Sequence, residues 1–236
     1  MVFYTSAFCS MWGYRSYLEV TGGYNFFTSK QLMAVGACGA GEVFTHTPSL
    51  VFNAVYLFGG ERDMYSVYVK KDGVALSNKG RYLLSRDDGS EIEAEEQWDL
   101  HYVGIGARKY FFAEQFKTFM LLPYLGADAG AYFAPNAYSE LSVYGAGGTE
   151  TASGKFRGEG FVPGLNFEAG ADFWFMEEAA IVLKTGYRIC SGMLRATLKE
   201  GDLKPAGIAD VLEVPVNHSG FYIQAGFTLN FKSYNY

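Results

Sequence analysis

The sequence contains no run of about 18 or more consecutive apolar residues. A transmembrane helix needs such a run, so a helical membrane span is excluded. There is also no convincing segment with the 3.6-residue period of an amphipathic helix, and no internal repeat with a period of about 20–50 residues. These absences leave strands as the expected elements.

Charged residues are scarce, at 19% of the 236 residues against roughly 25% in ordinary soluble domains. The net charge is −6, whereas a nucleic-acid-binding protein would show a basic patch or stripe. We therefore expect no nucleic-acid partner.

Cysteine is rare, and its three positions, Cys9, Cys38 and Cys190, show neither CxxC nor zinc-ligand spacing. One disulfide is conceivable, but three small residues in strands or loops are the favoured interpretation. The sequence predicts no metal site and no cofactor.

A secretory signal peptide is not legible at the start, MVFYTSAFCSMWGYRS, which has no basic region followed by a continuous apolar stretch. If the protein is exported, the numbering begins in the mature chain or the start is truncated. The sequence does not separate these two cases.

Strict alternation of apolar and polar residues is what the sequence does contain. In Phe221–Phe231 the residues Phe221, Ile223, Phe227 and Leu229 share one face with Ala225 and Phe231, and polar or small residues take the other. Successive strand residues face opposite sides of a sheet, so this segment predicts a strand with one apolar face.

Similar segments recur along the chain and give eight to ten antiparallel strands. The count is ten if the most N-terminal candidate is a strand, and eight if the N-terminal region is misread. The predicted strands are Val2–Phe8, Tyr14–Phe26, Leu32–Val43, Leu50–Phe58, Tyr65–Lys70, Leu100–Phe111, Thr118–Phe133, Asn166–Phe175, Ala180–Cys190 and Phe221–Phe231. Pro123 weakens one of them, because proline cannot donate to a strand ladder.

The predicted connections alternate between short and long. The short ones are Thr28–Lys30, Gly59–Asp63, Ala113–Lys117 and Met176–Glu178. The long ones are 71–97, 134–164 and 191–220, with Cys9–Gly13 and Thr45–Pro48 as shorter members of the same set. Tight turns at one end and long loops at the other are typical of transmembrane β-barrels.

Aromatic residues make up 17% of the chain and there are 29 glycines. A transmembrane barrel uses aromatic residues on its outer surface and in girdles at the membrane interfaces. We therefore predict an all-β fold: a closed, antiparallel, up-and-down transmembrane β-barrel. It would form one domain over residues 1–236, with 232–236 as a short C-terminal tail. A soluble calycin-like barrel, with its apolar residues inside, is the alternative.

Two features resemble the small outer-membrane β-barrel proteins of diderm bacteria, of the OmpA, OmpX and OmpW type. The first is the C-terminal signal of that family, matched by Gln224, Gly226, Leu229 and Phe231. The second is a recurrent Gly-Tyr followed by a polar residue, in GGYNFF (22–27) and TGYRI (185–189). The resemblance implies a location in the bacterial outer membrane, contact with outer-membrane lipid and lipopolysaccharide, and recognition of the last strand by the barrel-assembly machinery.

Charged residues on the polar faces would point into the lumen if the apolar faces point to lipid. These residues are Glu19, Arg108, Asp128, Glu168, Asp172, Lys184 and Arg188, with Glu42 as a further candidate. Side chains nearly fill a barrel of eight to ten strands, and opposite charges inside it should pair. The sequence thus predicts a plugged interior, with a narrow channel as the alternative.

The acidic segment DDGSEIEAEE (87–96) carries six carboxylates in ten residues. It does not match the ligand spacing of an EF-hand loop. A solvated hairpin tip around an Asp-Gly turn is the favoured interpretation. The long loops 71–97, 134–164 and 191–220 are the candidate surfaces for an extracellular partner.

Catalytic residues are not evident. His218 and Ser219 are consecutive, so on a strand they would face opposite sides, whereas a nucleophile and its base must lie within hydrogen-bond reach. Asp99 and His101 share a face, but no serine is placed to complete a triad with them. His46 is isolated in a predicted loop. We expect a non-enzymatic barrel with a structural, surface-interaction or narrow-channel role. The alternatives are a small-solute or ion channel, and a lipid A-modifying enzyme or surface protease.

Overall fold

The structure is a computed structural model, which describes residues 15–30, 42–59, 64–72, 76–111, 114–115, 119–176 and 178–230. Among these residues no helix is long and apolar enough to cross a bilayer. The described strands are β1 (Arg15–Lys30), β2 (Glu42–Gly59), β3 (Met64–Asp72), β4 (Leu76–Ser85), β5 (Glu91–Tyr110), β6 (Glu114–Gln115), β7 (Met120–Tyr144), β8 (Glu150–Glu159), β9 (Phe161–Trp174), β10 (Ala179–Asp202), β11 (Val211–Asn217) and β12 (Gly220–Asn230). One short 3₁₀ helix, η1 (Lys204–Ala206), lies between β10 and β11.

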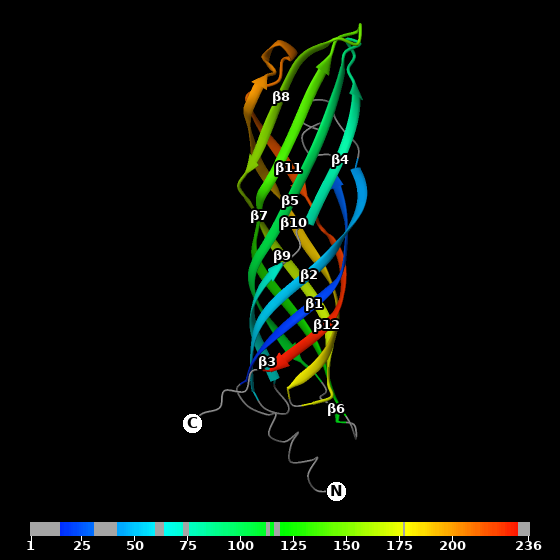
Figure 1. The fold of residues 1–236 in the computed structure, drawn as a ribbon. Coiled ribbons are helices and arrows are strands. Elements are labelled where there is room, and N and C mark those ends of the chain that lie inside the picture. The colour runs from blue at the N-terminus through cyan, green and yellow to red at the C-terminus, as the bar shows by residue number, and fades with distance from the viewer. Residues whose placement is uncertain are drawn as a thin grey trace.

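The strands form one closed antiparallel barrel (Figure 1). Strand β1 pairs with both β2 and β12, which closes the sheet on itself. Three positions in the wall are occupied by two strands that follow each other along the chain: β3 with β4, β8 with β9, and β11 with β12. Together with β1, β2, β5, β7 and β10 this makes eight wall positions, which agrees with the lower predicted count.

The N-terminal predictions differ most from the structure. Thr28–Lys30 is not a turn, because β1 continues to Lys30, which pairs with Glu42. Thr45–Pro48 is not a loop either, since it lies within β2. The predicted elements Val2–Phe8 and Cys9–Gly13, and residues 32–41 of the predicted strand Leu32–Val43, lie outside the described residues.

The strand ends that flank the short connections gather at one end of the barrel, as predicted (Figure 1). These connections are 60–63 between β2 and β3, 111–119 between β5 and β7, and 175–178 between β9 and β10. The predicted strand with Pro123 is present as part of β7, where Pro123 is opposite Ala171 and its carbonyl accepts a hydrogen bond from the Phe111 amide at 2.8 Å.

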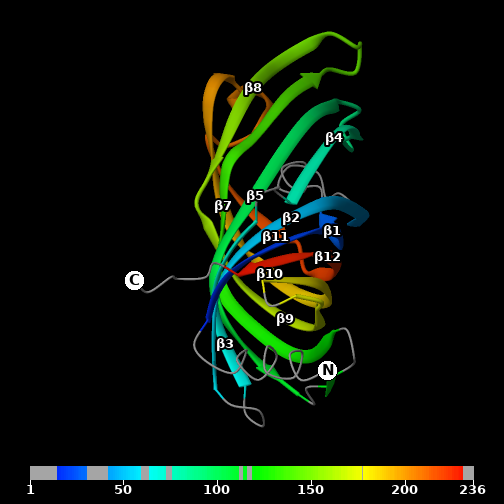
Figure 2. The same ribbon diagram turned by 60° about the horizontal axis from the view of Figure 1, so that its bottom comes forward.

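The three predicted long loops are mostly strand, which corrects the sequence-based picture. Segment 71–97 contains the hairpin β4–β5, segment 134–164 contains β7–β8, and segment 191–220 contains the outer half of β10 with β11. Strands β5, β7 and β10 are 20, 25 and 24 residues long, whereas a membrane-spanning strand needs about 9–11. The wall therefore continues far beyond one membrane thickness (Figure 2).

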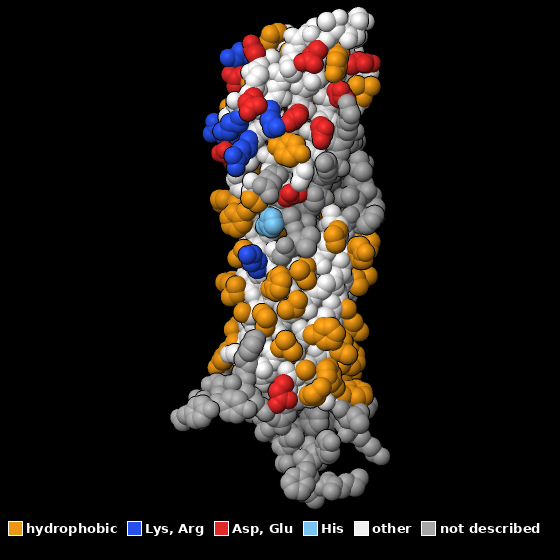
Figure 3. All heavy atoms as spheres, viewed as in Figure 1, with side chains coloured by type: hydrophobic (Ala, Val, Ile, Leu, Met, Phe, Trp, Pro, Cys, Tyr) orange, Lys and Arg blue, Asp and Glu red, His pale blue; other side chains and the backbone are white. Residues whose placement is uncertain are grey.

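A belt of apolar side chains covers the half of the barrel nearer the short turns on the face seen in Figure 3, and exposed apolar residues are also found on each of β1, β2, β3, β5, β7, β9, β10 and β12. It includes the outward-facing residues predicted from alternation, such as Ile105, Phe221 and Phe227, whose exposed fractions are 60–69%. Soluble monomers rarely expose such a large contiguous apolar surface. The belt is the surface of a transmembrane barrel, and it contradicts the soluble-barrel alternative, in which apolar residues point inward.

Glycines on the inner faces make room for tyrosine rings. A Cβ at Gly106 would lie 2.4 Å from the Tyr68 ring, and one at Gly186 would lie 2.4 Å from the Tyr222 ring. The rings cover the glycine backbone from a neighbouring strand, as in aromatic rescue of glycine in sheets. The tyrosines of the Gly-Tyr pattern itself, Tyr24 and Tyr187, are instead exposed on the outer surface.

Candidate functional site: the polar layer inside the barrel

The structure places all seven predicted lumen residues inside the barrel, with exposed fractions of 0–4%. They come from five strands: Glu19 from β1, Arg108 from β5, Asp128 from β7, Glu168 and Asp172 from β9, and Lys184 and Arg188 from β10. The strand count of eight explains their proximity, because the interior of such a barrel is only wide enough for side chains to meet. The side chain of Glu42 is outside the described residues.

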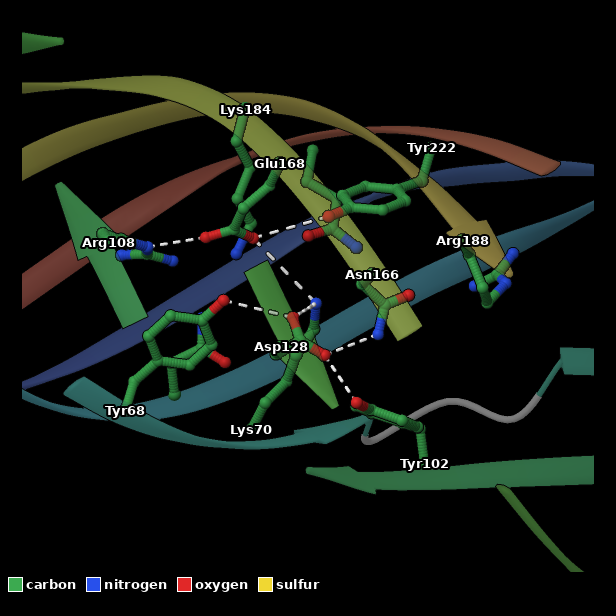
Figure 4. A network of polar contacts seen from close by, with 12 residues as sticks. Tyr68, Lys70, Tyr102, Arg108, Asp128, Asn166, Glu168, Lys184, Arg188 and Tyr222 are labelled. Atoms are coloured by element: carbon green, nitrogen blue, oxygen red, sulfur yellow. Dashed lines mark hydrogen bonds and ion pairs between the residues drawn. The ribbon is translucent and has the colours of Figure 1, made fainter. Parts of the chain in front are cut away.

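Arg108 is the centre of one group of buried polar contacts (Figure 4). Its Nη1 and Nη2 donate to the carboxylate of Glu19 at 2.5 and 3.1 Å, and its Nε donates to Glu168 at 2.6 Å. Lys184 also donates to Glu19, at 2.5 Å, and Asn53 adds a bond of 2.8 Å. The planar guanidinium thus joins two carboxylates, an arrangement to which its fixed fork of donors is suited.

Asp128 is a second centre on the neighbouring strand (Figure 4). Its carboxylate accepts from Lys70 at 3.0 Å, from Tyr68 at 3.1 Å, from Tyr102 at 2.5 Å and from Asn166 at 2.6 Å. Lys70 also lies 3.9 Å from Glu168, which joins the two centres.

Lys70 and the tyrosines are the members that sequence analysis missed. Lys70 ends the predicted strand Tyr65–Lys70, and alternation along that strand puts Ser66, Tyr68 and Lys70 on one face. The alternation along this strand could therefore have identified Lys70, but the predicted strand was too short for its inner face to be assigned. A buried tyrosine hydroxyl needs a partner, which the carboxylates of this layer supply.

Two of the predicted residues lie apart from these centres. Arg188 donates to Asn25 and to the backbone carbonyl of His218, each at 3.2 Å, and forms no ion pair with a described carboxylate. Asp172 accepts from Tyr110 at 3.2 Å, nearer the short-turn end. The seven residues therefore do not form one continuous network.

Apolar clusters lie on both sides of the polar layer. Toward the long hairpins, the interior is filled by a cluster that includes Ile92, Leu141, Phe156 and Val214. Toward the short turns, Leu57, Met120 and Trp174 belong to a second cluster. The largest fully buried side chains occur in all three regions, with Arg108 in the polar layer, Phe156 in the first cluster and Met120 in the second. The interior is therefore a filled core rather than an open lumen.

The long hairpins are joined to one another at their tips. Arg86, beside the β4–β5 turn, donates to the carbonyl of Ala206 in η1 at 3.0 Å. The predicted Asp-Gly turn is present, with Gly89 at φ 79° and a bond of 3.0 Å from its amide to the Arg86 carbonyl. The Ser90 hydroxyl and amide donate to Asp88, which lowers the pKa of that exposed carboxyl.

The acidic segment does not gather into a cation site. Within the described part of the chain, no group of three or more His, Cys, Asp or Glu side chains could hold a metal ion. Glu91 and Glu95 point to solvent, whereas Glu96 is buried and accepts from Ser139 at 3.5 Å. The segment is the tip and outer face of a hairpin.

The residues considered for catalysis are dispersed. Asp99 and His101 lie on the outer side of β5, and Asp99 accepts from Gln97 at 3.0 Å. His218 is fully buried, with neither ring nitrogen hydrogen-bonded, and the Ser219 hydroxyl bonds to the backbone of Cys190. Cys190 is a buried free thiol, whereas Cys9, Cys38 and the side chain of His46 lie outside the described residues.

The proposed assembly signal lies on β12. Gln224 is buried and donates to Ser49 at 2.6 Å, and a Cβ at Gly226 would lie 2.0 Å from the Val20 carbonyl oxygen. Leu229 is 50% exposed in the apolar belt, and Phe231 lies outside the described residues. The recognition of this strand by assembly machinery remains a prediction.

Comparison with known proteins finds similarity in three-dimensional structure but not in sequence. No family model and no curated protein matches the chain. Among solved structures, OprG of Pseudomonas aeruginosa is 12% identical, with 94% of this chain and 99% of that chain covered and a TM-score of 0.48. Neisserial surface protein A is 14% identical, with coverages of 93% and 99% and a TM-score of 0.35. The protease OmpT of Escherichia coli is 8% identical, with coverages of 92% and 96% and a TM-score of 0.40.

Proposed function

We propose that this chain is an integral protein of a bacterial outer membrane, non-enzymatic and non-conducting, whose role is carried by the hairpins above the membrane. The barrel serves as an anchor, and the hairpins present a rigid surface to the outside. The single observation that carries this proposal is the filled interior, in which a paired charge layer lies between two apolar clusters.

The charge layer supports a closed barrel for an energetic reason. Glu19, Arg108, Glu168 and Lys184 have side-chain exposures of 0% and satisfy one another. Opening a path through them would separate buried ion pairs, and each uncompensated charge would be costly. General solute diffusion takes barrels of about 16–18 strands, twice the number of wall positions found here.

The two ends of the barrel support the orientation. In outer-membrane barrels the short turns are periplasmic and the long connections are extracellular. Here the start of β1, the end of β12 and the short turns share one end, and the hairpins of β5, β7 and β10 rise from the other (Figure 1). An extracellular partner would therefore meet the hairpin surfaces 71–97, 134–164 and 191–220.

The absence of an enzymatic role is part of the proposal. A nucleophile and its base must lie within hydrogen-bond reach. His218 is buried with apolar and aromatic neighbours such as Phe27, at 4.8 Å between ring centroids, and Asp99 and His101 point outward from the wall. Replacement of Asp99, His101 or His218 would remove a lipid A-modifying or protease activity if the chain had one.

A narrow channel is the second candidate, and buried polar atoms without partners favour it. They include Thr47 Oγ1, Asp72 Oδ1 and Arg188 Nη2 on the hairpin side of the charge centres, and Ser66 Oγ and Trp174 Nε1 on the turn side. Buried polar groups normally have partners, so ordered water would satisfy these atoms. Water bound to these atoms would form one hydrated layer on each side of the charge centres. Such layers are compatible with a path for small ions.

Planar-bilayer recording separates the two candidates. We expect no discrete conductance from the purified full chain, and a measurable conductance after Arg108→Ala, which removes the bridge between Glu19 and Glu168. Lys155→Ala, which changes a pair on the outer surface, is the matched control and should behave like the wild type. Discrete conductance of the wild-type protein would contradict the sealed anchor and support the narrow channel.

A further inference from the structure

The junction between β11 and β12 contains a buried histidine that takes no part in the charge centres. His218 is 0% exposed, and neither of its ring nitrogens has a hydrogen-bond partner. Its ring lies against the Phe27 ring of β1, with 4.8 Å between the two centroids. Such a site accommodates the neutral imidazole, whereas a charged imidazole would be buried without a compensating group.

The charged group that acts on His218 within the described residues is another cation. Arg188 donates from Nε to the His218 carbonyl at 3.2 Å and forms no ion pair with a described carboxylate. Figure 4 shows Arg188 apart from the two charge centres. The other titratable groups around this arginine are Cys190 on β10, Tyr132 on β7 and Asp72 on β3, and none of them forms an ion pair with His218. A proton on His218 would therefore lie beside a guanidinium and away from any carboxylate.

The strand that precedes His218 is weakly held in the wall. Among the described strands β11 pairs with β10 alone, and Pro215 supplies no backbone donor. Val214 and Val216, which are 2% and 1% exposed, belong to the upper apolar cluster. Strand β12 below the junction pairs with both β1 and β10. Separation of β11 would thus leave the ladders of the membrane half intact.

The hydrogen bonds of the junction connect the position of the His218 ring to the attachment of β11. The His218 amide donates to the Cys190 carbonyl at 2.8 Å, and the Cys190 amide donates to the Ser219 hydroxyl at 3.1 Å. These bonds lie between the strand pairs Arg188–Gly220 and Ser191–Asn217. Turning the ring out to water would rotate the backbone at residue 218 and break them.

We propose that His218 is an acid-sensitive latch: the neutral ring holds β11 in the wall, and its protonation releases β11 toward the outside. The inference rests on the proposed function, because β11 is part of the hairpin surface 191–220 that would meet an extracellular partner. It adds regulation by pH to that surface.

The direction and size of the effect follow from the ordinary titration of histidine. An imidazole in water has a pKa of about 6.5, so His218 in the released junction takes up a proton below that pH. In the closed junction burial and the neighbouring guanidinium oppose the charge. The closed form is therefore fully favoured above about pH 6.5, and the ratio of released to closed form should rise roughly tenfold between pH 7.5 and 5.5.

The test is hydrogen exchange of the backbone amides of 211–219 in the purified full chain in detergent micelles. Exchange is measured at pH 7.5 and 5.5, and each rate is divided by the intrinsic rate at the same pH. We expect protection of β11 to fall roughly tenfold at pH 5.5. The amides of β9, in the membrane half, are the internal control and should keep their protection. Equal protection of β11 at both pH values would overturn the inference.

Variants identify the group that takes up the proton. H218Q and H218F remove the proton acceptor and should make the protection of β11 independent of pH. R188Q keeps His218 but removes the neighbouring cation, so β11 should lose less protection at pH 5.5 than in the wild type. H101Q, which changes a histidine on the outer side of β5, is the matched control and should behave like the wild type.

A full loss of protection at pH 5.5 in either His218 variant would assign the effect to another group and overturn the latch. If neither His218 variant gives a folded band, R188Q decides, and an undiminished loss in that variant counts against the latch.

Failure of this inference is distinguishable from failure of the proposed function. A wild-type chain that gives the folded band, but protects β11 equally at both pH values, contradicts only the latch. A chain that gives no folded band in any micelle contradicts the membrane barrel itself.

Discussion

At the scale of single residues, the interior is organised by pairing and by the fit of rings over glycines. Arg108 satisfies two carboxylates from different strands, and tyrosines such as Tyr68 and Tyr222 fill the space that glycines leave. The sequence predicted the seven charged residues of the interior, because alternation assigns each to a face. It did not predict which of them would meet, since pairing depends on the strand stagger around a closed barrel.

Arg108→Met should destabilise the barrel by roughly 3–5 kcal/mol, because it leaves Glu19 and Glu168 buried without their main partner. The measurement is unfolding in urea in detergent, followed by loss of the folded gel band. Lys155→Ala, at an exposed ion pair, should unfold with the wild type. Equal unfolding of the Arg108 variant and the wild type would mean that the pairs do not hold the interior together.

Gly106→Ala should cost about 1–3 kcal/mol, because the added methyl group would meet the Tyr68 ring and Asp128 Cβ at 2.4 and 2.6 Å. Gly147→Ala is the control, since nothing lies within 4 Å of a Cβ at that position. The same urea titration measures both variants. A neutral Gly106 variant would contradict the role of the glycine in seating the ring.

At the scale of elements, the strands near the membrane were predictable and the hairpins above it were not. In the belt, apolar residues face outward and polar ones inward, as for Ile105 and Arg108 on β5. Farther up the same strand the order reverses, with Ile92 and Ala94 inside and Glu91 and Glu95 outside. The alternation persists, but the apolar residues now face inward and the charged residues face outward. The acidic segment DDGSEIEAEE therefore resembles a solvated loop in sequence, although most of it is strand.

Leu141→Asp should loosen the hairpins without unfolding the barrel below them. Leu141 is 1% exposed in the upper apolar cluster, where a carboxylate would have no partner. Limited proteolysis should cut the variant within 134–164 while the folded gel band persists. Leu83→Asp is the control, because Leu83 is 64% exposed and should tolerate the change. Loss of the folded band in the Leu141 variant would show that hairpins and barrel unfold as one unit.

Phe231→Asp should block assembly into the membrane, if the last strand carries the recognition signal that its resemblance implies. The measurement is the amount of folded protein in the outer-membrane fraction of cells that express it. Lys232→Asp places the same charge one residue later, outside the signal, and should assemble normally. Normal assembly of both variants would count against the signal.

At the scale of the whole molecule, the barrel combines a membrane-type half with a half of soluble type. The membrane half has an apolar outer belt and a charged interior, and the outer half has an apolar interior and charged outer faces (Figure 3). The composition predicted the first half, because scarce charge and abundant aromatic residues fit a lipid-facing wall. The second half follows from the solvent, since strands that leave the bilayer must bury their apolar residues inward.

The most direct test of a membrane-anchored closed barrel is the migration of the outer-membrane fraction on SDS gels, with and without boiling. A closed barrel resists the detergent at room temperature, because the strands around its membrane half each pair with two neighbours; these strands are β1, β2, β3, β5, β7, β9, β10 and β12. We predict a faster band in the unboiled sample that converts to the full apparent mass on boiling. Identical migration in both lanes, with the protein in the soluble fraction, would contradict the account.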